Sequence, residues 1–529
     1  MNRVGTLARR HAGRLAVTLV TVFLSWFLFN AWFTAAWGVL PGIDEGDTRQ
    51  SIVLNATDCL TIALQSNLDI SISKYDPLIS EATVTQAMGE FDPLWSLNVL
   101  ESEEKTPTPA QYRLFGAPPS IWARTTNFDT TFQGKAPTGT TYSLNFGSIR
   151  SESTYTRARG GGEPEYRGMA DLTLTQPLLN GFGLNVNLAQ IRIAKNNKQM
   201  SDEALAQTVM DTVSQVLGAY WDLVFARENL GVARQSLRNA RDLVEQNKLR
   251  VEVGTAASIE VRQAEAGVKK REAEVISAIA LIRDAEDVLK LMLNVHENTE
   301  LWSQAVVPAD KPTLIMRALD EDLSYATALQ KRPELAQARK GVENSEVLVR
   351  LNRNALLPTI NLQGSYGFNS LRNGFNEEVD YLVRGDDWKF FYGVVGMIPV
   401  GNRLAKGQYL QSQYERDKMQ LAVRKVQQTI RVDVRSAIRR VETNSKLVET
   451  DAVATKLQER ALEDEKKRYE VGVSTSYRVL EFEEDLARAK SNELKALVDY
   501  RKALIALDRA EGVILDRHNV EFVSPDHRW

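Results

Sequence analysis

The sequence predicts a mainly α-helical, internally duplicated chain in which long coiled-coil helical hairpins are joined to a smaller set of membrane β-strands. Three observations lead to this prediction. The 529-residue chain has no proline in residues 178–307 or in residues 400–524. One glycine-centred stretch is written twice, as KLRVEVGTAASIEV at 248–261 and as KKRYEVGVSTSYRV at 466–479. Segments with alternating apolar and polar residues precede each of these windows.

The first residues predict export from the cytoplasm. A basic head, MNRVGTLARRHAGR, precedes an uncharged apolar stretch at 15–40, which is the pattern of a signal peptide. We expect residues 1–38 to be this signal peptide, with cleavage near Ala36 or Gly38, but the stretch is also long enough to remain as an uncleaved anchor. No other apolar run could form a membrane helix, so any further crossing would use strands.

The composition indicates neither catalysis nor metal or nucleic-acid binding. The net charge is −3, and the chain has four histidines and a single cysteine, Cys59. A disulfide within the chain is therefore impossible, and a Cys/His metal site is not expected. Cys59 lies in an apolar-periodic segment, where we expect a small buried residue. Without a phosphate-binding loop or a nucleophile motif, we predict that the chain is not an enzyme and has no cofactor.

The first proline-free window predicts two antiparallel helices. Proline costs about 3 kcal/mol inside a helix, so long windows without it favour helical structure. Leu205, Val209 and Val213 begin a series of apolar residues three or four positions apart, which forms the narrow seam of a coiled coil. A helix at 184–252 would be roughly 100 Å long, and a second helix would return at 257–293.

The second window repeats this arrangement, with helices expected at 401–470 and 475–513. In the two glycine-centred stretches seven of fourteen positions are identical, and the match continues without a gap at an offset of 218 residues. A match that keeps one period over this length indicates an internal duplication. Gly254 and Gly472 occupy the two turns, where a left-handed backbone favours glycine.

The segments before the helices predict β-strands with one apolar and one polar face. In LLPTINLQGSYGFN (356–369), Leu362, Tyr366 and Phe368 alternate with polar residues, and YSLNF at 142–146 alternates in the same way. Further strand-like segments lie at 91–100, 171–183 and 392–407. A tilted strand of about ten residues can cross a bilayer. A half-buried soluble sheet would show the same alternation, but the export signal favours a membrane barrel.

These elements divide the chain into two similar repeats. The expected boundaries are a signal peptide at 1–38, a first repeat at 50–300, an equatorial linker at 301–325, a second repeat at 326–515 and a tail at 516–529. Residues 101–167 form a polar β insertion in the first repeat, with a hairpin turn at Pro137-Thr138-Gly139. This insertion would form either extracellular loops or additional barrel strands.

Several longer segments carry a family resemblance. They are AYWDLVFARENLGVARQSL (219–237), the two EVG turns, RPELAQARKGVENSEVLVRLNRNALLP (332–358) and DYRKALIALDRAEG (499–512). Through them the chain resembles the TolC-like outer-membrane efflux proteins, also called outer-membrane factors. The resemblance covers residues 50–515, and the order of the elements agrees throughout.

This resemblance implies an outer-membrane location and a role as the exit duct of a tripartite efflux or type I secretion system. Members are homotrimers in which each protomer gives four strands to a shared twelve-stranded outer-membrane β-barrel, while the helices form a periplasmic α-barrel. A periplasmic adaptor (membrane fusion) protein docks on the hairpin tips, and an inner-membrane pump or ABC exporter supplies the substrate. The apolar seams of the long helices agree with this picture, since neighbouring subunits would cover them.

Two similar turns per chain would give six similar tips around a trimer, an end that a ring of adaptor hairpins could bind. The residues that the resemblance assigns to tip docking are Val253, Gly254, Thr255, Val471, Gly472 and Val473. The alternative is that these glycines only reverse the chain.

Family members narrow the tip with acidic residues just past each turn. Here the corresponding positions hold Glu260 and Gln263 in the first copy, and Arg478 and Glu481 in the second. Ser474 occupies a position where well-known members have a latching arginine, so the sequence departs from them. Our hypothesis is that Glu260 and Arg478 face each other across neighbouring hairpins and hold a closed tip, with Glu481 lining the opening. Ordinary solvated charges on a helix face are the alternative.

A periplasmic coiled-coil scaffold or adaptor without a membrane barrel is the rival prediction for function. It would account for the long helices, but not for the alternating strands that precede them at matched places in both repeats. The transported substrate and the class of pump leave no signature in these residues.

Overall fold

The computed structural model describes residues 49–154, 163–295 and 299–520, so the predicted signal peptide lies outside the described residues. The described chain forms two compact units. The hairpin unit contains residues 49–66, Gln215–Arg317 and Arg440–Leu504, and the sheet unit contains Asn67–Ser214, Ala318–Arg439 and residues 505–520. Across these described ranges, no helix combines the length and apolar character that a membrane span requires.

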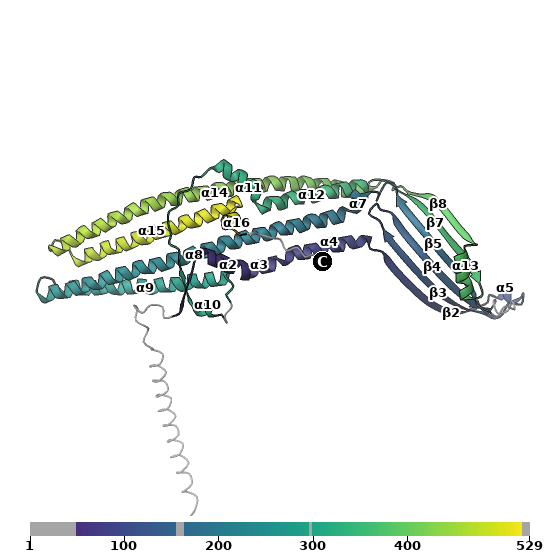
Figure 1. The fold of residues 1–529 in the computed structure, drawn as a ribbon, viewed down its shortest axis with the longest axis horizontal. Coiled ribbons are helices and arrows are strands. Elements are labelled where there is room, and N and C mark those ends of the chain that lie inside the picture. Colours follow the sequence, from purple (N-terminus) through teal and green to yellow (C-terminus); the bar gives the residue numbers. More distant parts are fainter. Residues whose placement is uncertain (1–48, 155–162, 296–298, 521–529) are drawn as a thin grey trace, which may run out of the picture. The chain divides into compact units, whose positions relative to one another are not determined.

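The sheet unit is built on one antiparallel sheet with the strand order β2-β3-β4-β5-β7-β8 (Figure 1). Its strands are β2 Leu94–Pro107, β3 Ser120–Lys135, β4 Thr141–Ser153, β5 Glu165–Pro177, β7 Thr359–Arg372 and β8 Trp388–Met397. The first four strands form a meander in chain order. The strands of the second predicted repeat continue this meander, because β7 pairs with β5 from Tyr166↔Arg372 to Pro177↔Asn361.

The insertion at 101–167 contributes strands to this sheet. Strands β3 and β4 form a hairpin whose turn is closed by hydrogen bonds from Ala136 N to Thr140 O (2.7 Å) and from Gly139 N to Ala136 O (2.8 Å). Gly139 has a φ of 96°, in the region that favours glycine. This hairpin is inserted between β2 and β5, so the sheet of the described chain has six strands, whereas the resemblance implies four barrel strands per chain.

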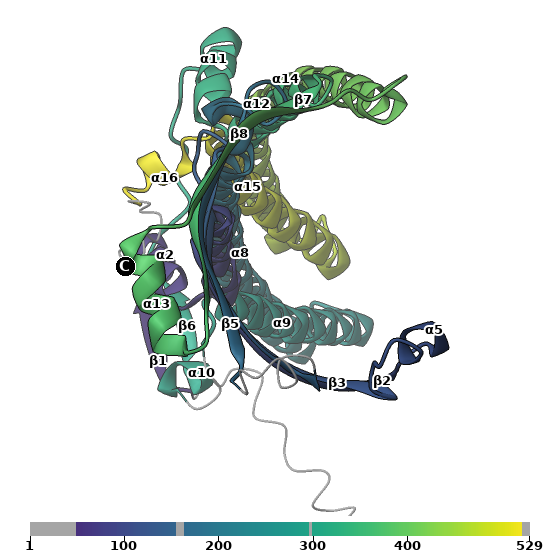
Figure 2. The same ribbon diagram turned by 90° about the vertical axis from the view of Figure 1, so that its right-hand side faces the viewer.

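The sheet is curved (Figure 2). Its two faces differ in polarity. The register places Phe132, Leu144, Leu172, Tyr366 and Phe390 on one face in neighbouring strands. The opposite face carries the intervening residues, which are mostly Ser, Thr, Asn, Gln and Asp. The predicted alternation of apolar and polar residues is thus confirmed in both parts of the chain.

Helix α13, Phe375–Arg384, lies against the convex face of the sheet (Figure 2). Its Glu378 accepts a hydrogen bond from the Ser148 hydroxyl at 2.8 Å. Gly168 permits this close approach, since a Cβ there would lie 2.3 Å from Glu378 Oε1 and 2.7 Å from Leu382 Cδ1. Leu144 pairs with Leu172, and Ser148 pairs with Gly168 four residues further along each strand. Residues an even number of positions apart lie on the same face of a strand, so all four share one face. The apolar face is therefore the convex one.

Along the chain, helices precede and follow the strands of this sheet. Those that lie wholly in the sheet unit are α3 Leu68–Ser73, α4 Tyr75–Met88, the 3₁₀ turn η1 Gly89–Phe91, α5 Ala110–Arg113, α7 Leu184–Asn187, α11 Glu321–Lys331, α12 Pro333–Asn354, α13 and α16 Ile514–Arg517. Three longer helices run through both units, α8 Ala189–Glu252, α14 Arg403–Glu470 and α15 Ser476–Glu511. The four predicted long helices are confirmed, except that the first is interrupted at Leu188, between α7 and α8.

An ion-pair network joins four helices of the sheet unit. Arg332 donates to Glu334 at 2.8 Å and to Asp433 at 2.9 Å. Arg509 donates to the same Glu334 at 3.0 Å and to Asp211 at 2.6 Å. Burial acts to raise the pKa of Glu334, but hydrogen bonds from Arg332 and the nearby Arg509 charge outweigh it and lower that pKa to about 2.

We expect this network to make the helices acid-sensitive. Because the folded-state pKa of Glu334 is depressed from 4.5 to about 2, its stabilisation is present above pH 4.5 and is lost as the pH falls towards 2. At about 1.4 kcal/mol per pKa unit, the loss amounts to roughly 3 kcal/mol. Thermal unfolding can be followed through the helical circular dichroism signal at pH 5 and at pH 3. The midpoint temperature should fall less between these two pH values for Glu334→Gln than for the unmodified chain. Glu343→Gln, which removes an exposed Lys340 pair, should follow the unmodified chain; equal slopes for all three proteins would contradict the assignment.

The hairpin unit contains the returning helix α9, Ser258–Met292, together with parts of α8, α14 and α15. Helix α2, Ala56–Ser66, and a two-stranded parallel sheet of β1 Ser51–Leu54 and β6 Ala305–Pro308 accompany them. A short helix, α10 Glu300–Ser303, precedes β6. The predicted linker at 301–325 therefore contains most of α10, strand β6 and the start of α11.

A buried carboxylate ties this unit together. Glu286 on α9 is fully buried and accepts hydrogen bonds from Arg227 at 2.6 Å and from Arg49 at 2.9 Å. One turn further on, the buried Lys290 donates to the carbonyls of Trp302 at 2.8 Å and Gln304 at 2.7 Å. These contacts fix the returning helix to α8 and to the segment that leads into β6.

Candidate functional site

Both predicted tips end in the same helix-terminating turn. After α8, Gly254 N donates to Val251 O at 3.0 Å and Thr255 N donates to Arg250 O at 2.8 Å. After α14, Gly472 N donates to Tyr469 O at 3.1 Å, and the next amide, of Val473, donates to Arg468 O at 3.0 Å. This pair of bonds is the Schellman motif, which requires a left-handed residue just past the helix. Gly254 and Gly472 supply it with φ of 74° and 80°.

The tips present apolar side chains to solvent in the described chain. Val253 is 72% exposed, and Val471 and Val473 are each 74% exposed. Thr255 is also exposed, and its hydroxyl donates to Arg250 O at 3.0 Å. Most of each valine side chain is therefore accessible for contact with another protein.

The two tips are tied to each other, which the sequence analysis did not foresee. The guanidinium of Arg250, at the end of α8, donates to the carbonyls of Tyr469 at 3.1 Å and Glu470 at 3.3 Å. It also lies over the Tyr469 ring, 4.3 Å from its centroid. The Tyr469 hydroxyl donates to Asn247, and burial raises the pKa of this hydroxyl, which keeps it protonated. The sequence repeat did contain one indication of this contact. The two copies differ at this position, because Val251 in the first copy is equivalent to Tyr469 in the second.

The structure brings two of the four proposed gate residues together. Gln263 on α9 and Glu481 on α15 line the same groove of about 530 Å³ between the two hairpins. Glu260 lies near the start of α9, and its backbone carbonyl accepts a hydrogen bond from the Asn247 side chain on α8 at 3.2 Å. This contact is within the first hairpin. Arg478 is exposed, and no ion pair joins it to Glu260 within the ranges described. A pairing between neighbouring copies stays a prediction.

Ser474, the departure from the family pattern, has a local role. Its hydroxyl donates to the carboxylate of Glu465, which also accepts from Arg468 at 3.5 Å. The serine therefore links the turn to the last part of α14.

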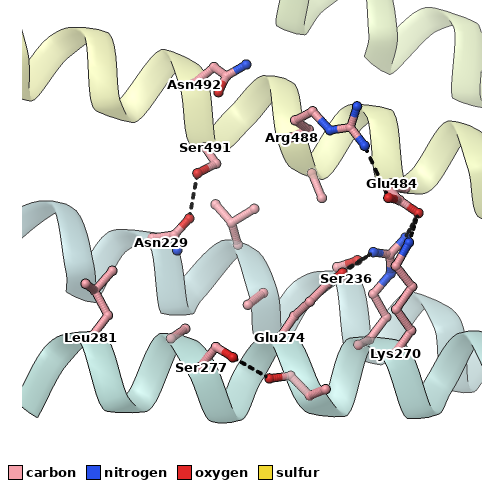
Figure 3. Close-up of a pocket in the computed structure, with 16 residues that line it drawn as sticks. Asn229, Ser236, Lys270, Glu274, Ser277, Leu281, Glu484, Arg488, Ser491 and Asn492 are labelled. Carbon is pink, nitrogen blue, oxygen red and sulfur yellow. Dashed lines mark hydrogen bonds and ion pairs between the residues drawn. The ribbon is translucent and has the colours of Figure 1, made fainter.

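Charged and polar residues line the groove further along the hairpins and contact one another (Figure 3). Glu484 on α15 accepts from Lys270 at 2.6 Å and lies 3.6 Å from Arg271, both on α9. Ser491 on α15 donates to Asn229 on α8 at 2.7 Å. This part of the groove has a volume of about 590 Å³ and is lined by all three helices. Helix α9 lies close to α15 at Gly267, where a Cβ would lie 3.0 Å from Leu480 Cδ1.

We expect Arg250→Ala to loosen the tip. The substitution removes two hydrogen bonds and one cation–π contact, which together stabilise the joined tips by roughly 2 kcal/mol. Purified protein in planar bilayers should then show a higher resting conductance than the unmodified chain. Arg262→Ala removes an exposed arginine of the same hairpin and should leave the conductance unchanged. Equal resting conductance in the two variants would show that the Arg250 contacts do not restrict the tip.

The concave face of the sheet is a second candidate surface. Its polar rows include Asp171, which accepts from Lys389 at 3.0 Å, and Thr173, which donates to Ser365 at 3.0 Å. A polar face opposite an apolar one is the pattern of a strand that separates lipid from water. The chemistry of these groups suits the passage of hydrated solutes.

No group of three or more metal-binding side chains occurs in the part of the chain that the structure describes. Cys59 is completely buried, and burial raises the pKa of its thiol to about 12. The expectation of a small buried residue at this position is confirmed.

Comparison with known proteins places these features in a family. The model of the outer membrane efflux protein family matches residues 140–295 and 324–513. The outer membrane efflux protein BepC of Brucella suis is 25% identical over 355 residues, covering 66% of this chain and 73% of BepC. The alkaline protease secretion protein AprF of Pseudomonas aeruginosa is 26% identical over 400 residues, covering 72% of this chain and 78% of AprF.

Solved structures share the fold. A membrane protein from Pseudomonas aeruginosa has a TM-score of 0.64 at 17% identity, covering 87% of this chain and 91% of that one. The Campylobacter jejuni outer membrane channel CmeC has a TM-score of 0.61 at 17% identity, covering 90% of this chain and 91% of CmeC.

Helical hairpins joined to a sheet are the fold that the chain shares with these solved membrane-protein structures. The chain belongs to the outer membrane efflux protein family. Its place is therefore the outer membrane, and its general role is in efflux or secretion.

Proposed function

We propose that three copies of this chain form the exit duct of a tripartite efflux or type I secretion system. The duct receives substrate from an inner-membrane pump or ABC exporter and carries it across the periplasm and the outer membrane without catalysing a reaction. The observation that carries this proposal is the division of the curved sheet into a convex apolar face and a concave polar face. Only several copies around one axis can enclose a channel with such a sheet.

The rival function, a periplasmic scaffold without a membrane barrel, does not explain the convex face. A soluble scaffold would leave Trp95, Leu144 and Tyr392, which are 72%, 53% and 76% exposed, in contact with water. In a membrane the same residues contact lipid. Family membership supports the same choice.

The experiment that tests the duct is a fractionation of the native host followed by purification in detergent. We expect the protein in the outer-membrane fraction, as a trimer with heat-modifiable migration on gels, and we expect the purified trimer to conduct ions in planar bilayers. A soluble monomer that does not insert into bilayers would overturn the proposal.

The hairpin tips are the proposed docking site for the periplasmic adaptor. The exposed Val253, Val471 and Val473 give each protomer two apolar tips with the same turn geometry. Val253→Asp combined with Val471→Asp should abolish cross-linking to the adaptor while the trimer still reaches the outer membrane. Val288→Asp, at a residue of α9 that is 50% exposed, should leave cross-linking intact. Cross-linking that survives the tip substitutions would exclude this docking site.

The charges past the turns are the proposed gate. In the trimer, Glu260 of one hairpin pairs with Arg478 of a neighbouring hairpin, and Gln263 and Glu481 line the opening between them. An exposed pair of this kind contributes under about 1 kcal/mol, although three related copies act together. Glu260→Ala and Arg478→Ala should each raise passive leakage of large antibiotics into the host. Unchanged leakage in both variants would remove the gate from the mechanism.

A further inference from the structure

We propose that three copies of this chain enclose an outer-membrane barrel of eighteen strands, six from each copy, through contacts between the β8 edge of one copy and the β2 edge of the next. This inference rests on the trimer of the proposed function but goes beyond it, since the family resemblance implies twelve strands. The partner is a second copy of the same chain, and the channel is incomplete without it.

The added hairpin is a full part of the sheet. Strand β3 pairs with β2 from Leu94↔Gln133 to Pro107↔Ser120, along the whole length of β2. Strand β4 pairs with β5 from Thr141↔Thr175 to Ser151↔Glu165. A barrel with four strands per copy would require β2 to pair directly with β5, and both of these ladders would have to break.

The added hairpin also has the face polarity of its neighbours. Phe128 contacts Phe146 with ring centroids 6.1 Å apart, and Phe132 contacts Tyr142 at 6.2 Å, all on the convex side. The concave side of the same hairpin is polar, and there the Thr131 hydroxyl donates to Asn145 at 2.9 Å. A hairpin that formed an extracellular cap would have no use for a continuous apolar face. The pattern fits a strand pair with lipid on one side and water on the other.

The two outer edges are suited to each other. Each of the five strand pairs in the sheet is antiparallel, so β8 runs antiparallel to β2. The β8 edge of one copy can therefore form an antiparallel ladder with the β2 edge of the next. In that ladder Phe390 and Val394 of β8 lie on the same convex side as Leu97 and Val99 of β2. Closure between copies removes the unpaired backbone groups that a membrane cannot solvate.

The width of the sheet matches the helices to which it is joined. In the sheet unit, α4 leads into β2, β5 leads into α8, α12 leads into β7 and β8 leads into α14, which makes four helices per copy. Four packed helices cover about 32–40 Å of wall. Six strands about 4.8 Å apart and tilted by about 40° cover about 38 Å, whereas four would cover about 25 Å. Six strands continue the helical wall without a steeper tilt.

The strand number determines the bore. At equal tilt, a barrel of eighteen strands has a backbone diameter of about 36 Å, compared with about 24 Å for twelve strands. Its cross-section is more than twice as large, and the lining is polar. Such an outlet is wide enough for hydrated polypeptide as well as small solutes.

Electron cryo-microscopy of the full chain, purified in detergent, tests the strand number. We expect three-fold particles whose membrane section shows eighteen strands, with residues 120–153 in the wall. Three-fold particles with twelve strands would overturn this inference and leave the proposed duct intact. Particles without three-fold symmetry or a closed wall would overturn both.

Disulfide cross-linking gives an independent test. The only native cysteine, Cys59, is buried, so introduced cysteines report without background. The pair Phe146→Cys with Ala170→Cys, which are opposite each other in β4 and β5, should form an intramolecular disulfide in outer-membrane trimers. Phe146→Cys alone is the control and should give no intramolecular bond. Trimers in which the double variant stays reduced under oxidising conditions, while a pair joining β2 to β5 is oxidised, would overturn the eighteen-strand wall.

Discussion

Replacing Leu144 or Leu172 by arginine should abolish accumulation of the trimer in the outer membrane. The two residues are opposite each other in β4 and β5, in the middle of the convex apolar face, and are 53% and 44% exposed in the isolated chain. An arginine at the middle of a bilayer costs about 2–4 kcal/mol, and a trimer contains three copies of it. Outer-membrane fractionation and gel migration without heating measure the loss directly.

A matched control separates the lipid face from general damage to the strand. Ser143→Arg lies one residue away in β4, on the concave face, between Gln133 and Thr173 in the neighbouring strands. The same side chain would there extend into water, and trimer recovery should remain near that of the unmodified chain. If Ser143→Arg and Leu144→Arg reduce recovery equally, the assignment of the faces is wrong.

Glu286→Ala should give the second large effect, in the hairpin unit. The substitution removes the buried carboxylate that pairs with both Arg49 and Arg227. Breaking a buried ion pair by removing one partner costs about 3–5 kcal/mol, and we expect roughly 3 kcal/mol because both arginines keep some contact with solvent. Thermal unfolding followed by circular dichroism should show a lower midpoint.

Two further variants identify the cause of that loss. Glu286→Gln keeps an acceptor of the same shape without the charge and should recover part of the stability. Glu459→Ala removes an exposed pair with Lys490, with side chains 48% and 40% exposed, and should change the free energy of unfolding by less than about 1 kcal/mol. A loss for Glu459→Ala as large as that for Glu286→Ala would show that the buried carboxylate has no special role.

Periodicity in the sequence was sufficient to predict the long helices and their turns. The expected helix at 257–293 is observed at Ser258–Met292, and the two tip glycines have the left-handed backbone that the turns require. These features are local, because helix propensity and turn geometry depend on residues close in the chain. The break at Leu188 was not predicted, since no proline or glycine marks it.

Features that depend on distant residues were harder to predict. The alternation at 142–146 indicated a strand, but only its pairing with β3 and β5 shows that the insertion widens the sheet. The Arg250–Tyr469 contact joins residues 219 positions apart, and nothing in either tip alone reveals it. Glu286 resembled the many acidic residues on helix surfaces, and its burial follows from two arginines elsewhere in the chain. Long-range pairing of this kind leaves no periodic pattern in a single sequence.

The order of strands has a consequence for biogenesis. The four-stranded meander β2–β5 is complete early in the chain, but its next neighbour, β7, lies much later, and Thr173 and Ser365, which face each other, are 192 positions apart. During export the edge of β5 therefore stays unpaired until the second half of the polypeptide arrives. An incomplete sheet with an exposed apolar face is prone to aggregate with other chains. The newly exported protein should depend on a periplasmic holdase until β7 and β8 have arrived.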